Sequence, residues 1–389
     1  MFESVHPLRP TWLEISLDAI TNNVKQIRGY LNPTCELMAV VKANAYGHGA
    51  VGVAKTVLQA GASRLAVATL SEAIELRMNG IQAAILVLGY TPARLAAEAL
   101  RYRITVTVYD LDVVTALHLM ASAANQVAKV HVKINTGMNR LGLTVQDTPQ
   151  FLRTIKEFPY ICVEGIFTHF ATSDLTDKSF ANLQFHRFAD LLKLLEQLGL
   201  RPPLAHAANS AAIITMPHTH LQMVRAGIAL YGLHPDAEQT RLPDSFHPAL
   251  TWKAQIAHLF KIQPGESISY GQEYVAEQPM TVAVMPVGYA DGFPRTAHNW
   301  GSVLIAGQAT PIIGRICMDQ TMVDVTHIEM PPGSLAQGDE IILIGRQGNA
   351  AISIDEIAKR LQTNNYDVVS RILSRVPRIF VEHAEFNTE

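Results

Sequence analysis

The chain has 389 residues, 48% of them hydrophobic and 17% charged, which is typical of a globular protein and excludes a disordered one. Its 31 basic and 34 acidic residues give a formal net charge of −3, so no basic surface for nucleic acid or anionic membrane is expected. Three cysteines are a poor disulfide framework and favour a reducing cytoplasm. No apolar run approaches the roughly 18 residues of a membrane span, and residues 1–7 carry no signal-peptide pattern.

The first two-thirds of the sequence alternates short apolar runs with longer amphipathic stretches such as Ser71–Arg77, which follows a serine cap. The predicted strands are Leu37–Ala43, Arg64–Thr69, Ala83–Gly89, Ile104–Asp110, Ala128–Ile134, Ile161–His169, Leu204–Ala208 and Met223–Ile228. Strands that alternate with helices form parallel βαβ units, and eight such units in about 220 residues predict a closed (β/α)8 barrel. The alternative is an open doubly wound sheet, which the lack of a glycine-rich dinucleotide turn after the first strand disfavours.

The sequence changes character after a polar, proline-containing stretch at His234–Pro248, which is typical of a linker. Beyond it, Thr281–Val287, Ser302–Ile305 and Glu340–Ile344 are predicted strands separated by Gly/Pro turns, and Asp355–Leu361 is the one clear helical pattern. We therefore predict a barrel domain at residues 1–243 and a mostly β domain at residues 244–389.

Functional residues of such barrels lie at the carboxyl ends of the strands. Lys42 follows the first predicted strand in a partly apolar setting. Burial lowers the pKa of a lysine and favours the neutral amine, which can form a Schiff base with a carbonyl. A lysine that merely extends from the barrel rim is an equally consistent interpretation at this position.

Other strand ends carry groups that suit an anion. Arg140 could hold a carboxylate or form a surface ion pair, and His169 could be catalytic or structural. Asn209 or Ser210 caps a predicted helix whose free N–H groups could bind phosphate, and Gly227 permits close backbone approach. A plain N-cap is the simpler alternative. A Schiff-base lysine, an anion site and nearby cations together fit pyridoxal phosphate.

The segment Ala39–Gly49 closely resembles the pyridoxal-phosphate attachment motif of alanine racemases. The same resemblance continues, in chain order, through Thr136–Gly142, His206–Ser210, Met223–Ile228, Ser269–Gly271, Gly288–Gly292, Gly314–Gln320 and Arg375–Arg378. It spans nearly the whole chain and both predicted domains.

The resemblance implies an enzyme that interconverts L-alanine and D-alanine with pyridoxal 5'-phosphate, as a homodimer with shared sites. It implies that Lys42 carries the cofactor and acts as one base, and that Tyr270 from the β domain of the other subunit is the second base. Arg140 and Met318 would orient the substrate carboxylate. The implied cofactor-binding positions are Lys42, Tyr46, His169, His206, Asn209, Ser210, Arg225, Gly227, Ile228 and Tyr366.

Three details of the resemblance concern charge. Arg225 matches an arginine that faces the pyridine nitrogen, with His206 supporting it. A charged His169 beside Tyr270 would lower the pKa of the tyrosine. Lys133 matches a lysine that is carbamylated in some members, although Asn135 stands where many relatives have aspartate.

Rival functions remain at this point. A metal-dependent hydrolase could use Lys133, His169 and His206 as ligands, but Arg225 would repel the metal. A non-catalytic pyridoxal-phosphate carrier would lack the β domain, and a decarboxylase would place an acidic group against the pyridine nitrogen. Broader specificity, for example towards serine, stays open because one methylene or hydroxyl changes selectivity only modestly. We expect the product D-alanine to supply peptidoglycan, with a catabolic role as the alternative.

Overall fold

A computed structural model describes residues 8–295, 300–328 and 335–382. Residues 1–7, on which the expected lack of a signal peptide depends, lie outside these ranges. The contacts between residues divide the chain into two compact units. The barrel unit comprises Ala19–Ala45 and Ala50–His247, and the β-rich unit comprises the described residues within Met1–Asp18, Tyr46–Gly49 and Pro248–Glu389. No helix among the described residues is both long enough and apolar enough to cross a membrane.

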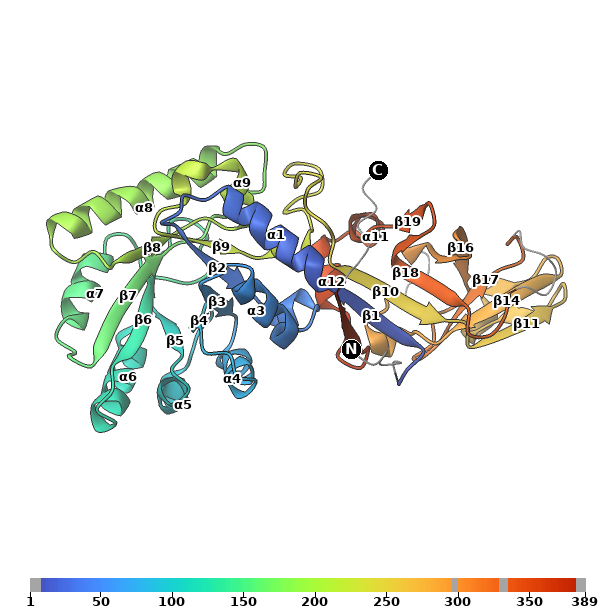
Figure 1. Ribbon diagram of the computed structural model, residues 1–389, viewed down its shortest axis with the longest axis horizontal. Coiled ribbons are helices and arrows are strands. Elements are labelled where there is room, and N and C mark those ends of the chain that lie inside the picture. Colours follow the sequence, from blue (N-terminus) through green and yellow to red (C-terminus); the bar gives the residue numbers. More distant parts are fainter. Residues whose placement is uncertain (1–7, 296–299, 329–334, 383–389) are drawn as a thin grey trace. The chain divides into compact units, whose positions relative to one another are not determined.

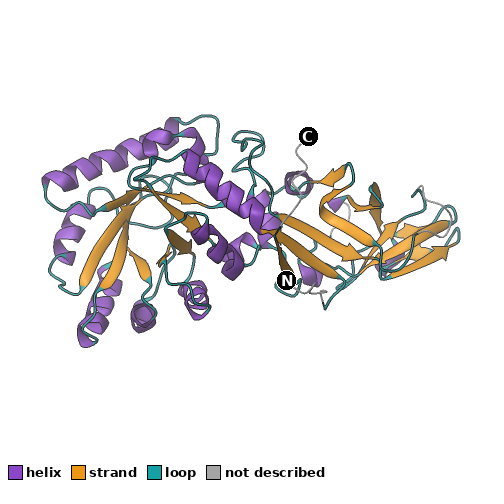
Figure 2. Ribbon diagram, viewed as in Figure 1, coloured by secondary structure: helices purple, strands orange, loops and turns teal. Residues whose placement is uncertain are grey.

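The barrel unit is built on a closed barrel of parallel strands, which confirms the predicted fold class (Figures 1 and 2). Its strands are β2 (Glu36–Val40), β3 (Arg64–Val67), β4 (Ala84–Val87), β5 (Thr105–Val108), β6 (Ala128–Lys133), β7 (Ile161–Phe167), β8 (Leu204–His206) and β9 (Met223–Ala226). Strand β9 pairs with β2 and closes the ring. Seven predicted runs contain one of these strands, and the eighth, Leu37–Ala43, overlaps β2, which begins one residue earlier at Glu36. Each strand ends slightly earlier than predicted because the polar loop begins sooner.

Helices alternate with the barrel strands and cover their outer faces (Figure 2). They are α1 (Leu17–Gly29), α3 (Ala50–Gln59), α4 (Leu70–Met78), α5 (Ala96–Arg101), α6 (Leu111–Ala123), α7 (Thr148–Ile155), α8 (Ser179–Gln197) and α9 (Ser210–Thr215). The cap of α4 is Thr69 rather than the predicted serine, because Thr69 and Glu72 exchange side-chain and backbone hydrogen bonds in a capping box. Apolar strand residues such as Val130 and Val132 are fully buried, as expected beneath such a helical layer.

The β-rich unit contains a large, mostly antiparallel sheet in the order β11-β14-β17-β16-β15-β18-β10-β1-β20, with β19 on β18. The bounds are β1 (Thr11–Ser16), β10 (Leu250–Gln255), β11 (His258–Ile262), β14 (Met280–Met285), β15 (Ser302–Ile305), β16 (Gln308–Ile313), β17 (Thr321–Asp324), β18 (Glu340–Gln347), β19 (Ala350–Ile352) and β20 (Arg378–Val381). A short hairpin joins β12 (Ser267–Ile268) to β13 (Tyr274–Val275). The predicted helix is α11 (Ile354–Arg360), and α12 (Asn365–Ser370) is a second helix that the sequence pattern did not reveal.

The N-terminal strand belongs to this sheet. Strand β1 pairs antiparallel with β10, where Leu13 faces Trp252, and parallel with β20, where Leu13 faces Arg378. In Figure 1 the blue β1 lies beside the yellow β10. The expected division assigned residues 1–243 to the barrel, whereas these ladder hydrogen bonds place β1 in the β-rich unit.

Candidate active site

A left-handed turn follows Lys42 at the end of β2. In α2 (Lys42–Tyr46) the φ angles of Ala43, Asn44, Ala45 and Tyr46 are 51°, 53°, 54° and 52°. Each non-glycine residue in this conformation costs roughly 1–2 kcal/mol, because its Cβ approaches the following carbonyl oxygen. The turn ends the strand at Val40, short of the predicted Ala43.

Side chains hold this strained turn in place. Glu72 Oε1 accepts the N–H of Ala43 at 2.6 Å, and its Oε2 accepts the N–H of Ala68 at 2.7 Å. Asn44 Oδ1 accepts the N–H of Ala50 at 2.7 Å. Backbone strain persists where the surroundings determine it in this way, and such strain clusters at functional sites.

Lys42 is partly buried, and the site favours its neutral form. Burial lowers the pKa of its amine, the positive charge of Arg140 lowers it further, and Glu72 opposes both effects. A neutral amine is the form that can act as a nucleophile or a base. The structure therefore supports the chemistry predicted for this strand end.

Several hydrogen-bonding groups lie at the strand ends of β8 and β9. Asn209 caps α9, since its Oδ1 accepts the N–H of Ala212 at 3.0 Å. Ser210 is 5% exposed, and its Oγ accepts the N–H of Gly227 at 2.9 Å and that of Ala229 at 3.3 Å. The hydroxyl hydrogen of Ser210 is then free to be donated to an anion.

Arg225 lies inside the barrel and is 4% exposed. Its Nη1 donates to His206 Nδ1 at 2.7 Å, and its Nη2 reaches the carbonyl oxygens of Thr168 and Ala207 at 2.9 Å and His169 Nδ1 at 3.2 Å. Within the described residues its hydrogen bonds all leave from Nη1 and Nη2, so Nε–H is available to another group. Burial lowers the pKa of Arg225 to about 9, and the guanidinium still carries its charge at neutral pH.

The histidines beside Arg225 are neutral. Burial lowers the pKa of both His169 and His206 well below the usual value, and the positive charge of Arg225 acts in the same direction. Arg225 also donates to the Nδ1 atom of each ring, which requires an unprotonated nitrogen there. The expectation of a charged His169 that lowers the pKa of Tyr270 is therefore wrong, because an arginine is its neighbour.

Lys133 is 6% exposed, and its Nζ has no hydrogen-bond partner among the described residues. The amine lies 4.7 Å from the centre of the Phe167 ring. Burial lowers the pKa of Lys133 well below the usual value, and Arg225 and Arg140 lower it further. Asn135 accepts backbone N–H groups of Gly137 and Asn139 at 3.1 and 3.0 Å and so shapes the loop that carries Arg140.

Four predicted residues belong to the β-rich unit. Burial raises the pKa of Tyr46, whose ring centre lies 6.0 Å from that of Tyr366. Tyr270 is 65% exposed and follows Ser269, which has a φ of 66° and donates through Oγ to the carbonyl oxygen of Arg315 at 2.5 Å. Met318 is also exposed.

The remaining predicted residues converge within the barrel unit. The basic side chains of Arg225, Lys133, Arg140 and Lys42, when charged, all lower the pKa of His169, which places these four groups near one histidine. Ile228 is buried and begins the short helix η3 (Ile228–Tyr231) directly after Gly227. Among the described residues, no group of three or more His, Cys, Asp or Glu side chains could hold a metal ion.

Comparisons with known proteins agree with this geometry. The family model for the N-terminal domain of alanine racemase matches residues 15–235, and that for the C-terminal domain matches residues 249–380. Alanine racemase 2 from Caldanaerobacter subterraneus subsp. tengcongensis is 44% identical over 388 residues, which cover 99% of this chain and 97% of that relative. The chain belongs to the alanine racemase family.

Solved structures match nearly the whole chain. An alanine racemase from Clostridium difficile 630 is 39% identical, with a TM-score of 0.92 and coverage of 98% of both chains. A histidine racemase from Leuconostoc mesenteroides subsp. sake is 30% identical, with a TM-score of 0.88 and coverage of 97% of this chain and 99% of that one. Racemases named for two different amino acids thus share this fold, which alone does not decide the substrate.

Sequence reasoning missed Glu72, His131 and Glu164, which contact the predicted residues of this family member. Glu72 holds the turn after Lys42, and His131 bonds His206 at 2.9 Å between ring nitrogens. One signal was present in the sequence. Strand Ala128–Lys133 carries polar residues at every second position, which turns one polar face into the barrel.

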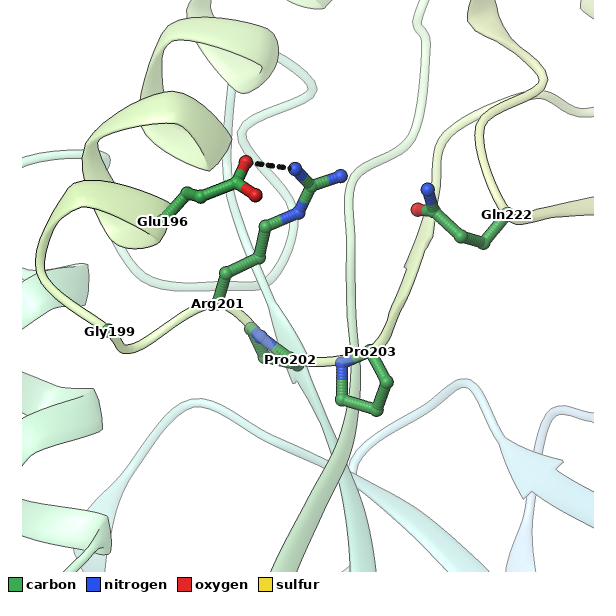
Figure 3. A pocket seen from close by; sticks show the side chains of 6 residues that line it. All are labelled: Glu196, Gly199, Arg201, Pro202, Pro203 and Gln222. Atoms are coloured by element: carbon green, nitrogen blue, oxygen red, sulfur yellow. Dashed lines mark hydrogen bonds and ion pairs between the residues drawn. The ribbon is translucent and has the colours of Figure 1, made fainter.

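The opposite end of the barrel has a pocket of a different kind (Figure 3). This open pocket, of about 530 Å³, is lined by residues that precede β8 and β9. Its charged side chains neutralise each other, because Arg201 donates to Glu196 at 2.5 Å. Since barrel active sites lie at the carboxyl ends of the strands, this pocket is not the candidate site.

Proposed function

We propose that this member of the alanine racemase family interconverts L-alanine and D-alanine with pyridoxal 5'-phosphate, through Lys42 and Tyr270. The observation that carries the proposal is that a lysine of lowered pKa and a buried serine, whose hydroxyl hydrogen is free for an anion, lie at the strand ends of one barrel. The family membership supports the reaction, and the donor set supports the cofactor.

The residues of the barrel unit suit this cofactor. Lys42 would bind it covalently, and Asn209, Ser210, Gly227 and Ile228 would surround its phosphate. Tyr46 and Tyr366, which belong to the β-rich unit, are further cofactor-binding residues of the proposal. Among the described residues, no acceptor is assigned to the hydroxyl hydrogen of Ser210 or to the Nε–H of Arg225, and these donors suit a phosphate and a pyridine nitrogen. His169 and His206 would flank the ring. When bound, pyridoxal phosphate withdraws electrons from the substrate Cα and acidifies its proton.

Racemisation needs a base on each face of the substrate, because the proton leaves one face and another arrives on the opposite face. Lys42 Nζ and Tyr270 Oη serve as these two bases, and their roles exchange with the direction of the reaction. The lowered pKa of Lys42 supports its part, since a neutral amine can accept the Cα proton. Met318 and Arg140 hold the substrate carboxylate, and Arg140 supplies the opposite charge for it.

Arg225 limits how far charge spreads into the cofactor. Because Arg225 remains charged, it would disfavour a proton on the pyridine nitrogen of a bound cofactor. With the cofactor bound, an unprotonated ring nitrogen would withdraw less charge from the substrate, which would suppress transamination at some cost in Cα acidity. Replacing Arg225 with glutamate should increase the number of transamination events per racemisation, and an unchanged ratio would contradict this role.

Carbamylation of Lys133 is part of the proposal. Burial and the nearby arginines lower the pKa of this amine, and its Nζ has no hydrogen-bond partner among the described residues. In its neutral form the nitrogen can bond to the carbon of CO2 and release a proton. The resulting carbamate would offset the charges of Arg225 and Arg140. Intact mass spectrometry with and without bicarbonate should show a bicarbonate-dependent CO2 adduct that Lys133→Met abolishes.

The substrate is the point that an assay resolves best. Circular dichroism with a panel of L-amino acids should show alanine losing its optical activity fastest, with serine slower. Equal rates for serine or a larger amino acid would favour a racemase of broader specificity. Failure with every amino acid would overturn the proposed function.

The proposed dimer shares its sites, with Tyr270 acting on the cofactor of the other subunit. Lys42→Ala and Tyr270→Ala should each be inactive alone. A purified heterodimer of the two variants has one intact site of two, so it should recover about half of the wild-type activity by two-fold symmetry. A verified heterodimer without activity would show that Tyr270 serves its own chain.

We further propose that the enzyme works in the cytoplasm and supplies D-alanine for peptidoglycan. Expression of the gene in a bacterium that requires added D-alanine should restore growth without it. Growth restored by an inactive Lys42→Ala variant would contradict this role.

A further inference from the structure

A chain of buried hydrogen bonds leads from Arg225 through the barrel interior to Glu164. Arg225 Nη1 contacts His206 Nδ1 at 2.7 Å, and His206 Nε2 contacts His131 Nδ1 at 2.9 Å. His131 Nε2 then contacts Glu164 Oε2 at 3.4 Å. Arg225, His206 and His131 are at most 4% exposed, so water does not substitute for these partners.

The two ends of this chain dictate where its protons lie. A guanidinium can only donate, so His206 Nδ1 is an acceptor and the proton of this neutral ring lies on Nε2. His206 Nε2–H therefore donates to His131 Nδ1, which places the proton of His131 on Nε2. That proton in turn points at the carboxylate of Glu164, which can only accept when ionised. Each histidine thus has one permitted tautomer.

The backbone has two local features that allow this arrangement. The β6–β7 register shifts between Val130 and His131, so that Val163 and Gly165 face these successive residues and Glu164 is the extra residue of a bulge. A bulge re-aims the side chain it carries. A Cβ on Gly165 would lie 2.5 Å from the His131 ring, so a glycine is required for the imidazole to lie there.

Aromatic and ionic contacts fix the remaining degrees of freedom. Phe167 stacks on His206 with ring centres 4.7 Å apart and planes 3° apart, which sets the orientation of the imidazole. Glu164 also accepts from Arg64 and Lys129, each at 2.9 Å. These contacts keep Glu164 ionised, since the hydrogen bond from His131 and the two cations lower its pKa to about 2.

We propose that Glu164 and His131 are positioning residues for the reaction, because they fix the tautomer of His206 and thereby hold Arg225 in place. If His206 carried its proton on Nδ1, that N–H would face the N–H of Arg225 and displace the guanidinium. The inference rests on the proposed function only in that its kinetic test uses alanine racemisation.

Neutron diffraction from deuterium-exchanged crystals of the holoenzyme tests the proton positions directly. We expect deuterium on Nε2 of both His206 and His131 and none on their Nδ1 atoms. Deuterium on either Nδ1 atom would overturn the proposal. This measurement does not depend on turnover. The hydrogen-bond relay, meaning the chain from Arg225 through His206 and His131 to Glu164, would therefore be confirmed even if alanine is the wrong substrate.

Substitutions of Glu164 then test whether its hydrogen bond to His131 or only its negative charge is needed. Glu164→Gln and Glu164→Met both remove the negative charge, but the amide oxygen of glutamine still accepts from His131. Loss of the outer partner of a metal-binding histidine costs roughly 10- to 100-fold, and we expect kcat of Glu164→Met to fall by a similar factor with KM nearly unchanged. Glu164→Gln should retain most of the activity.

The matched control is Lys129→Gln, which removes an exposed ion pair to the same carboxylate and leaves the relay intact. Its kcat should stay within about twofold of the wild type, as expected for an exposed ion pair. Equal losses in Glu164→Gln and Glu164→Met would indicate charge pairing alone and overturn the proposal. If Glu164→Met does not fold, the neutron map of the wild type still decides.

Discussion

The barrel interior and the β-rich unit differ in how their buried ionisable groups are paired. In the β-rich unit, Asp291, Arg9 and Arg375 form a cluster of opposite charges, here called the Asp291 cluster. At the strand ends of the barrel, Lys133 Nζ has no hydrogen-bond partner among the described residues, and Arg225 is held by neutral histidines and carbonyl oxygens. Asp291 is fully buried, but it accepts from Arg9 at 2.7 Å and Arg375 at 2.8 Å.

This difference is expected between a ligand-binding site, in the barrel, and a structural ion cluster, around Asp291. The Asp291 cluster is complete within its own unit, since the N–H of Gly288 also donates to the carboxylate at 3.0 Å. Among the described residues Arg225 hydrogen-bonds only neutral groups and Lys133 Nζ has no hydrogen-bond partner, so an anionic ligand would supply a counter-charge there. Charge that lacks a partner in a folded protein is costly, and it persists where a ligand or a reaction uses it.

The largest effect is expected in the barrel, where we propose that a ligand binds. Lys42→Ala should lower racemisation by more than about 1000-fold, because the substitution removes both the cofactor attachment and a base. Borohydride treatment of the wild type should fix the cofactor to Lys42, and peptide mapping should locate it there. A reduced adduct on another lysine would contradict the assignment.

The next effect concerns Glu164, where the barrel interior does have a balanced carboxylate. Its pKa of about 2 in the folded state lies below the usual value near 4.3 of an unfolded chain, so the unfolded state binds more protons between these values. The stabilisation is fully present above about pH 5 and falls by about 3 kcal/mol as the pH drops towards 2.

Chemical denaturation of the wild type and Glu164→Gln across this pH range measures that contribution. The difference between the two free energies of unfolding should shrink steadily on acidification. A difference that does not vary with pH would mean that Glu164 is not stabilised as an anion.

A smaller loss is expected in the complete cluster. Asp291→Asn should lower the free energy of unfolding by about 2 kcal/mol, less than the 3–5 kcal/mol of a fully buried pair, because Arg9 and Arg375 are partly exposed and regain water. Asp319→Asn is the control, since this exposed partner of Arg375 should contribute less than about 0.5 kcal/mol. Similar losses in both variants would remove the distinction drawn for Asp291.

The smallest effect on stability is expected in the left-handed turn after Lys42. Ala43→Gly should stabilise the protein by about 0.5 kcal/mol, because relief of left-handed strain slightly exceeds the entropic cost of glycine. Ala97→Gly, at an exposed position within α5, should instead destabilise it by about 1 kcal/mol. Thermal denaturation of the pair gives both signs, and a loss in Ala43→Gly would show that the turn is not strained.

The barrel could be predicted because its signals are local. Alternating apolar runs and amphipathic stretches identify each βα unit, and strand ends such as Lys42 and Gly227 follow from the fold rule. The turn after Lys42 could not be predicted, since four successive non-glycine residues with positive φ contradict local preference and depend on Glu72, which lies 29 positions away.

Long-range pairing explains the other misses. Strand β1 joins residues that lie more than 230 positions later, so nothing in Thr11–Ser16 itself indicates its sheet. The hydrogen-bond relay could not be predicted from the sequence, because a bulge changes the direction of the Glu164 side chain. The bulge interrupts the alternation of inward- and outward-facing residues on which such a prediction depends. The role of Tyr270 was inferred from the family resemblance rather than from its own surroundings.

The left-handed turn makes the chain locally receptive to residues of the opposite handedness. A D-amino acid prefers positive φ for the same steric reason that an L-amino acid avoids it. A semisynthetic protein with D-alanine at position 43, where φ is 51°, would relax the backbone while keeping the methyl group. At this position, next to the lysine proposed to act on both enantiomers of alanine, the backbone itself favours the D form.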